Sequence, residues 1–117
     1  MFNPSCIFCK IIQGQIKSDF IKENDFVVAI RDISPKAPTH ILLIPKKHVA
    51  SVVDLQEDDA QYVWHLLKMA RDVSKDLCRG KGFNLIANNG ADAGQSVFHM
   101  HFHFLSGRNI AEGGLKL

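Results

Sequence analysis

The sequence predicts an α+β protein in which a mainly antiparallel, five-stranded sheet packs on one long helix. Two short strand-like segments and one continuous apolar segment precede a single long amphipathic segment, and two more strand-like segments follow it. This order lacks the regular strand–helix–strand alternation that is typical of a parallel sheet. The chain of 117 residues is most simply one domain, and it is long enough to bury a real core.

The elements near the N-terminus are short. Residues 6–12 form an apolar segment, expected as a turn or short helix that Gly14 closes. Residues 20–23 and 26–31 are predicted strands, because Asn24-Asp25 between them is a hairpin turn signal.

A third strand is expected at residues 40–45, after a loop at residues 31–38 that two prolines restrict. This strand is almost continuously apolar, which is typical of a central or doubly covered position in a sheet. The basic residues Lys46, Lys47 and His48 follow this strand directly.

The one long helix is expected at residues 57–78. Asp54 and Glu57 fit a capping box at its start, and Gly80 and Gly82 end it. Its apolar residues recur at helical spacing, and they are Ala60, Val63, Trp64, Leu67, Ala70, Val73 and Leu77. Trp64 and its apolar neighbours are most simply core, although a dimer interface could use the same face. We expect His65 to be solvated and Cys78 to be an inert core thiol.

The C-terminal third supplies the remaining strands and the most unusual pattern. Residues 83–88 are a predicted strand, and residues 89–96 form a glycine-bearing loop that leads into a strand at residues 95–105. Such a loop can present backbone N–H groups and a serine hydroxyl to a phosphate, although any hairpin needs a similar loop. Residues 107–117 are expected to be a loosely ordered tail.

Three histidines alternate with large apolar residues in the last predicted strand. Because strand side chains point alternately to opposite faces, His99, His101 and His103 are expected on one face, directed into solvent or a cleft. The opposite, core-like face carries Phe98, Met100, Phe102 and Phe104.

Composition excludes several classes of function. A formal charge of +2 is too small to argue for a nucleic-acid polymer or a membrane surface as partner. The sequence contains no apolar run of transmembrane length, and we expect no signal peptide at its start. Three cysteines without a disulfide pattern favour a reducing, cytoplasmic setting.

Local patterns alone leave alternatives open. Cys6 and Cys9 have the spacing of half a zinc site, but two small buried thiols would look the same. Asp32 could accept a hydrogen bond from a ligand hydroxyl or could simply cap a turn. Imidazoles in series suit either metal ligation or nucleophilic attack on phosphorus. The preceding loop favours phosphorus chemistry, because it offers phosphate ligands rather than carboxylates or thiolates.

Residues 99–105 match the His-φ-His-φ-His-φ-φ signature of the histidine triad (HIT) family, where φ is an apolar residue. Further segments resemble the Hint branch of that family, in the family's order, at residues 6–12, 32–35, 37–40, 44–48, 88–90 and 94–97. The resemblance covers about residues 4–108 as a single HIT domain within residues 1–117, with residues 109–117 as a tail.

The resemblance implies a homodimer that binds purine nucleotides such as AMP and hydrolyses nucleoside phosphoramidates. It implies that His101 attacks the α-phosphorus to form a nucleotidyl-histidine intermediate, which water then cleaves. His103 and His40 would hold the phosphate and manage protons. Ser96, with the backbone of Gly94 and Gln95, would stabilise charge on the phosphate oxygens.

The resemblance also implies a nucleoside site and a metal site. Asp32 would bind the ribose hydroxyls, Asn88 would support the phosphate, and Ile7, Phe8 and Ile33 would enclose the base. Members of the family that carry zinc suggest four ligands here, which are Cys6, Cys9, His48 and His99. Such a closed set would hold a structural zinc, and no cofactor would be needed for catalysis.

The chain departs from close relatives in two places. Residues 105–108 lack a pair of glycines that is often found there, and residues 113–117 lack the Trp-Pro-Pro-Gly ending of some animal relatives. The preference for a leaving group is therefore open. Alternative functions are a zinc hydrolase with His99, His101 and His103 as ligands, a nucleotide-binding regulator with little turnover, and a dinucleoside polyphosphate hydrolase or nucleotidyl transferase of the same family.

Overall fold

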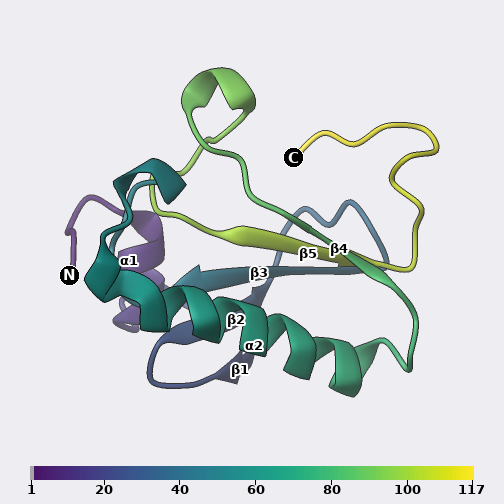
Figure 1. The fold of residues 1–117 in the computed structure, drawn as a ribbon, viewed down its shortest axis with the longest axis horizontal. Helices are drawn as coiled ribbons and strands as arrows, with labels where there is room; N and C mark the ends of the chain where they lie inside the picture. The colour runs from purple at the N-terminus through teal and green to yellow at the C-terminus, as the bar shows by residue number, and fades with distance from the viewer. Residues whose placement is uncertain (1) are drawn as a thin grey trace.

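The computed structural model describes residues 2–117. Its main elements are α1 (Ile7–Ile12), β1 (Phe20–Glu23), β2 (Val27–Arg31), β3 (Thr39–Pro45), α2 (Ala60–Leu77), β4 (Phe83–Ile86) and β5 (Phe102–Ser106) (Figure 1). Three single-turn 3₁₀ helices complete the set, namely η1 (Val52–Asp54), η2 (Glu57–Asp59) and η3 (Ala91–Ala93).

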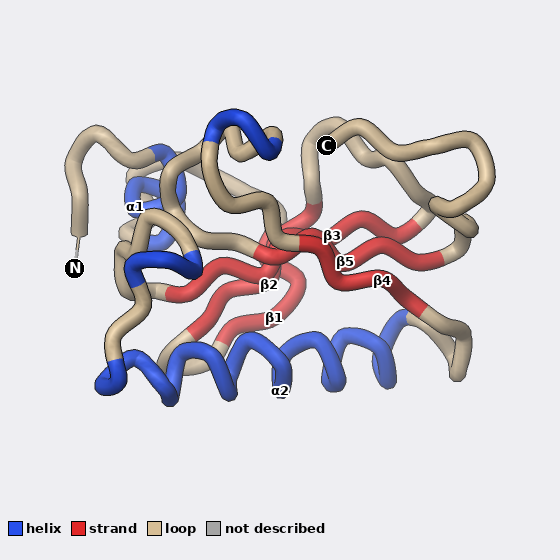
Figure 2. The backbone as a smooth tube through the Cα atoms, turned by 45° about the horizontal axis from the view of Figure 1, so that its top comes forward, coloured by secondary structure: helices blue, strands red, loops and turns tan. Residues whose placement is uncertain are grey.

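The strands form one five-stranded sheet in the order β1-β2-β3-β5-β4, and every neighbouring pair is antiparallel. Figure 2 shows α2 running along one face of this sheet, whereas α1 and the η3 loop lie on the other side. The predicted α+β fold class is therefore confirmed.

The sheet is covered on both faces. Side chains of its central strands point alternately to the two faces, and so they contribute to two separate apolar clusters. Ile41 and Leu43 of β3 face α2, where they join the core that contains Met69 and Val73. Leu42 and Ile44 face the other way and pack with Phe8, Ile11, Cys9 and the N-cap residue Cys6 at α1. The continuous apolar run of β3 thus reflects a doubly covered strand, as the sequence indicates.

The start of the long helix differs from the prediction. The capping box joins Gln56 and Asp59, whose carboxylate accepts from the Gln56 N–H at 2.9 Å, rather than Asp54 and Glu57. Asp59 is almost fully buried and forms an ion pair with Lys47, just after β3. This pair fixes where the helix begins, so that residues 57–59 form a 3₁₀ turn and α2 starts at Ala60.

The buried face of α2 also differs from the predicted one. Leu66 and Met69 are buried with Ala70 and Val73, whereas the Trp64 side chain is 54% exposed and Leu67 is 47% exposed. Apolar spacing alone could not separate these two adjacent faces, because both are apolar.

His65 lies within α2, and Cys78 is its C-cap residue. His65 is half-buried and stacks on Phe26, with ring centroids 4.3 Å apart, so the expected solvated position is wrong. Cys78 is buried in the core, as expected. No helix within residues 2–117 is long and apolar enough to cross a membrane.

The histidine segment is regular only in its second half. β5 begins at Phe102, and a bend at residues 97–99 followed by irregular backbone at residues 100–101 replaces the predicted strand. Met100 and Phe104 are buried in the core, but Phe98 is 51% exposed, outside the predicted core face. The tail lies over the sheet, and Arg108 donates to the carbonyl oxygens of Lys36, at 2.9 Å, and Gly114.

Candidate functional site

All residues predicted for catalysis or substrate binding line one cavity of about 340 Å³ on the face of the sheet that carries α1. They are Ile7, Phe8, Asp32, Ile33, His40, Asn88, Gly94, Gln95, Ser96, His101 and His103. The structure therefore brings together the N-terminal helix, the loop before β3, the η3 loop and the start of β5.

The three triad histidines do not share one environment. His101 and His103 line the cavity, whereas His99 is fully buried and turns toward the cysteines of α1. The expectation from alternation, that all three rings face solvent or a cleft, is wrong for His99. The reason is the bend at residues 97–99 and the irregular backbone that follows it, where the period of a regular strand does not apply.

His101 has one ring nitrogen fixed as a donor. Its Nδ1 lies 2.8 Å from the backbone oxygen of His99, and a carbonyl oxygen only accepts, so Nδ1 carries the proton. In the neutral ring, Nε2 then holds the lone pair. Burial lowers the pKa of His101, so the ring is neutral near pH 7. Phe8 contacts the ring edge-on, with centroids 5.0 Å apart, and restricts its orientation.

The His40 and His103 rings form a hydrogen-bonded chain with a defined direction. The backbone N–H of Lys36 donates to His40 Nδ1 at 3.0 Å, so the proton of neutral His40 lies on Nε2. That Nε2–H faces His103 Nδ1 at 2.9 Å and donates to it. His103 consequently carries its own proton on Nε2, on the opposite edge of its ring.

Asp32 completes this group from the loop before β3. One carboxylate oxygen accepts from the Ser34 N–H at 2.7 Å, and the other lies 3.4 Å from His40 Nε2. We call Asp32, His40 and His103 the proton cluster. Burial lowers the pKa of His40, an effect that the Asp32 charge opposes. Burial and then the neighbouring imidazoles lower the pKa of His103 to about 4.

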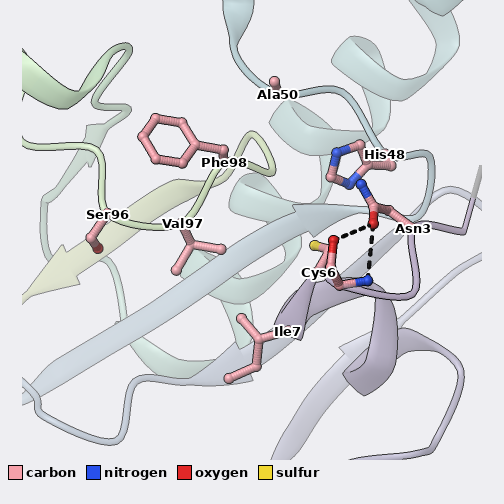
Figure 3. A pocket seen from close by; sticks show the side chains of 9 residues that line it. Asn3, Cys6, Ile7, His48, Ala50, Ser96, Val97 and Phe98 are labelled. Carbon is pink, nitrogen blue, oxygen red and sulfur yellow. Dashed lines mark hydrogen bonds between the residues drawn. The ribbon is translucent and has the colours of Figure 1, made fainter.

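The η3 loop is braced by the side chain of Gln95, which is buried. Its amide oxygen accepts from the Gly90 N–H at 2.9 Å, and its amide nitrogen donates to the oxygens of Ala50 and Val97 at 2.7 and 3.0 Å. One side chain therefore ties the η3 loop to Ala50, which follows β3 along the chain, and to Val97 in the cavity wall (Figure 3).

Two backbone N–H groups of this loop already donate hydrogen bonds within the loop. The Gly94 N–H donates to the Ala91 oxygen at 3.1 Å, and the Gln95 N–H donates to the Gly90 oxygen at 3.0 Å. These two N–H groups, which the resemblance implied as phosphate ligands, are used inside the loop in this arrangement. Gly94 still lines the cavity, where its positive φ of 95° favours glycine and a Cβ would lie 3.6 Å from the Asn88 amide.

Four ligand-type side chains meet behind the cavity, and we call them the metal cluster: Cys6, Cys9, His48 and His99. His99 Nδ1 lies 3.3 Å from Cys6 Sγ, 3.5 Å from Cys9 Sγ and 3.2 Å from His48 Nδ1. Ligand atoms bound tetrahedrally to one zinc ion are separated by about 3.3–3.8 Å, given its usual bond lengths. The spacing fits such an ion.

The protonation of His99 fits a metal as well. Its Nε2 donates to the Pro45 oxygen at 2.8 Å, so the Nδ1 lone pair points to the cysteines and His48. Burial lowers the pKa of His99 to about 4, which keeps the ring in the neutral, ligating form. These residues could hold a metal ion, and His101 and His103 are not among them.

The sequence did not reveal several features of the site. Ser34, Lys36, Leu42, Val97 and Leu117 also line the cavity. Pro35 and Pro38 signalled a loop near Lys36, but no sequence pattern shows that its backbone N–H meets a ring nitrogen. Ile33, predicted to enclose a base, is 99% exposed at the rim.

Comparisons with known proteins agree with this geometry. The HIT domain family model matches residues 13–110. The chain is 44% identical over 102 residues to an uncharacterized HIT-like protein of Synechocystis, covering 87% of this chain and 90% of that protein.

Solved structures extend the likeness. A HIT family hydrolase from Legionella pneumophila superposes with a TM-score of 0.87 at 38% identity, covering 93% of this chain and 98% of that chain. A histidine triad nucleotide-binding protein from Candida albicans gives a TM-score of 0.81 at 37% identity, covering 92% of this chain and 78% of that chain.

Proposed function

The chain belongs to the HIT domain family, and from that premise we propose that it hydrolyses purine nucleoside phosphoramidates, as members of the Hint branch do. The observation that carries the proposal is the protonation of His101. Its Nδ1–H is fixed by the His99 oxygen, which leaves the Nε2 lone pair as a nucleophile in a ring that lines the cavity. The names of related hydrolases and a nucleotide-binding protein support the same reaction class.

In the first step, His101 Nε2 forms a bond to the α-phosphorus and the phosphorus–nitrogen bond breaks. The bonding pair stays with the departing amine, which takes a proton from water at the open face of the site. The ring is then a nucleotidyl-imidazolium, and the His99 oxygen stabilises its Nδ1–H. Covalent capture divides one difficult displacement into two easier ones.

In the second step, a water molecule attacks the phosphorus, loses a proton to solvent and returns the electron pair to His101 Nε2. The Nε2–H of His103 would donate a hydrogen bond to a phosphate oxygen in both steps, because the chain from Lys36 through His40 fixes the proton there. Ser96 would add a hydroxyl donor. The N–H groups of Gly94 and Gln95 would not contact the phosphate, because they donate within their own loop.

The remaining cavity residues suit a nucleoside. Asp32, which lines the cavity, would accept from the ribose hydroxyls, and Asn88 would support the phosphate beside Gly94. Ile7, Phe8 and the exposed Ile33 would contact the base, which the flat apolar surface of a purine favours.

We assign zinc to the metal cluster and give it a structural role. Two thiolates and two imidazoles are a usual closed zinc set, and a structural zinc supplies folding energy rather than chemistry. The proposal keeps the reaction itself independent of a cofactor, because His101 supplies the nucleophile. Thiolate ligands of this kind also suit the reducing, cytoplasmic setting that the cysteine pattern favours.

We further propose a homodimer. Trp64 and Leu67 present apolar surface on the outer side of α2, and β4 is an edge strand whose outer side is open to pairing. A second copy could cover both features at once. Sedimentation of the protein and of its Trp64→Glu variant tests this, because a charge on the apolar surface should shift the assembly toward monomer.

The decisive experiment follows AMP release from an adenosine phosphoramidate by native protein and by His101→Ala, each with and without chelator. We expect release that survives chelation as long as the protein stays folded, and loss of turnover by at least about 10³-fold in the variant. Activity that vanished on chelation and returned with zinc in a folded protein would favour the zinc-hydrolase alternative. Binding of AMP without turnover would favour the regulator, and preference for a bridged dinucleotide would favour the polyphosphate hydrolase.

A further inference from the structure

The loop that carries Asp32 and Lys36 is held at its base and at its middle. At the base, the Asp32 N–H donates to the His40 oxygen at 3.0 Å. In the middle, the Lys36 N–H donates to His40 Nδ1, and the Lys36 oxygen accepts from Arg108 Nη1 at 2.9 Å. Arg108 lies just beyond β5 and is not among the described residues that line the proposed site. The middle of the loop is therefore held by a distant segment of the chain.

Two prolines leave Lys36 as the least restricted residue in the middle of this loop. The ring of Pro35 fixes its own φ, and Pro38 restricts the residue before it to extended conformations. Lys36 lies between these positions and is subject to neither restriction. Its two peptide groups share one Cα, so holding its carbonyl limits the rotation that would carry its N–H away from the ring acceptor. Arg108 therefore supplies a restriction that the loop itself lacks.

Gly107, which precedes Arg108, lets the two segments approach closely. Its φ of 92° favours glycine, and a Cβ at this position would lie 3.0 Å from both Cβ and Cγ of Pro38. Side chains do not normally pack so tightly, so the backbone can lie against the proline ring only where no side chain is present. This close approach brings the Arg108 guanidinium within reach of the Lys36 oxygen.

The half-buried guanidinium of Arg108 donates in two directions. Nη1 donates to the Lys36 oxygen, and Nη2 donates to the Gly114 oxygen in the tail. A guanidinium is planar and holds its N–H donors in a fixed arrangement, so bonds to two different segments orient the whole group. The tail thus holds Arg108 from one side while Arg108 holds the loop on the other.

We propose that Arg108 is a positioning residue for the reaction proposed above, and that it acts through the ring proton of His40. This inference rests on the proposed function. Arg108 holds the Lys36 peptide, and the Lys36 N–H keeps the His40 proton on Nε2. That Nε2–H donates to His103, which directs its own proton to the phosphate. Without Arg108, the Lys36 N–H leaves His40 Nδ1 for part of the time, and the His40 proton can then occupy either nitrogen.

The first test is spectroscopic and does not depend on turnover. Arg108→Met keeps an unbranched apolar side chain without donors, whereas Arg108→Lys keeps one charged donor group. The nitrogen-15 spectrum of the His40 ring is recorded near pH 7 without substrate and assigned with His40→Gln. Native protein should show a bare Nδ1 and a protonated Nε2, and Arg108→Met should show exchange between the two tautomers. Arg108→Lys should restore most of the native pattern.

The second test is a double-mutant cycle on the hydrolysis of an adenosine phosphoramidate. Arg108→Met should lower kcat by about threefold, as expected from a weakened hydrogen bond. Lys36→Pro already lacks the N–H through which Arg108 acts, so adding Arg108→Met to that variant should cause no further loss. A general structural role would instead lower kcat by the same factor in both backgrounds.

Two controls separate the Lys36 contact from other effects. Arg31→Met removes an arginine that pairs with a carboxylate, and it should leave both kcat and the His40 tautomer unchanged. Removal of residues 113–117 deletes the second acceptor of the guanidinium but keeps its bond to Lys36, so the His40 proton should stay on Nε2. If this removal alone mixes the tautomers, the tail rather than the Lys36 contact fixes the proton, and the inference is wrong.

The failure of this inference and the failure of the proposed function look different. A single His40 tautomer in Arg108→Met, or an equal loss of kcat in both backgrounds of the cycle, overturns the positioning role and leaves the proposed function intact. Native protein that releases no AMP overturns the proposed function, and with it the role of Arg108 in that reaction, whatever the spectra show.

Discussion

The metal cluster and the proton cluster are built from similar side chains but hold their protons in opposite ways. In each, the ligand-type atoms lie within 4.8 Å of one another. In the metal cluster, the Pro45 oxygen takes the outer N–H of His99, so a lone pair points inward. In the proton cluster, the Lys36 N–H donates to the outer nitrogen of His40, so an N–H points inward.

This difference decides what each cluster can bind. A histidine that binds a metal normally donates its other N–H to an acceptor, as His99 does. His40 could bind a metal through Nε2 only by losing its remaining ring proton while Nδ1 still accepts from Lys36. The distances between ligand-type atoms would permit a metal ion at either cluster. The Lys36 N–H, which occupies Nδ1 of His40, disfavours an ion at the proton cluster, so only the metal cluster suits one. Four predictions test this comparison.

The largest expected effect is loss of the metal cluster. Cys6→Ser combined with Cys9→Ser should abolish zinc binding, measured by elemental analysis. It should lower the free energy of unfolding by about 4 kcal/mol when zinc is present at about a thousand times its Kd. Cys78→Ser alters a buried thiol outside the cluster and should retain zinc. Equal zinc content in the double variant and the native protein would show that the ion binds elsewhere.

Loss of the proton cluster should give the converse result. His103→Ala should reduce kcat for an adenosine phosphoramidate by about 10²-fold, because the N–H that faces the phosphate is lost. Its zinc content should equal that of the native protein, since His103 is outside the metal cluster. A variant that lost zinc along with activity would mean that the clusters are not separate.

A smaller effect is expected from the backbone donor itself. Lys36→Pro removes the N–H that fixes the His40 proton, so His40 can place its proton on Nδ1 and offer Nε2 to a metal. We expect kcat to fall about fivefold, as for loss of one hydrogen bond, and added zinc to inhibit this variant. Lys36→Ala keeps the N–H and should resist zinc like the native protein. Equal inhibition of the two variants, with unchanged circular dichroism, would contradict this explanation.

The smallest effect concerns acid stability. His103 has a pKa of about 4 in the folded protein against 6.5 for an ordinary histidine. The unfolded chain therefore binds a proton more readily, and the unfolding free energy should be constant above pH 6.5 and fall as the pH drops toward 4. We expect His103 to account for about 1 kcal/mol of this loss, since it lines an open cavity where solvent screens charge. Chemical denaturation of His103→Gln should show a shallower decline, and an identical decline would refute the assignment.

The sequence predicted the fold well because its signals are local and strong. The apolar run of β3, the Asn24-Asp25 turn and the single long helix each have one reasonable structural interpretation. The buried face of α2 was not predictable in this way, because Trp64 and Leu66 are both apolar and only tertiary packing selects between them. The predicted capping box at Asp54 and Glu57 was wrong for a similar reason. The ion pair between Lys47 and Asp59 joins segments on either side of η1, and such a tertiary contact has no local sequence signal.

The candidate site was predicted at the level of residues but not of protons. The alternating histidines and the preceding loop indicated His101, His103 and residues 94–96, whereas the other predicted residues that line the cavity were expected only from the family resemblance. The location of each ring proton depends on backbone groups, at Lys36, Pro45 and His99, that have no sequence signature. The sequence likewise does not show that the Gly94 and Gln95 N–H groups donate to carbonyl oxygens within their own loop.

The pairing of β3 with β5 has a consequence for folding kinetics. His40 and His103, which share a hydrogen bond, are 63 residues apart in the chain. Closing so long a loop costs chain entropy before any contact repays it, whereas the β1–β2 and β2–β3 hairpins close locally. The proton cluster therefore forms only after the chain between these strands has collapsed into place. A nascent chain therefore cannot assemble this cluster before β5 has docked against β3.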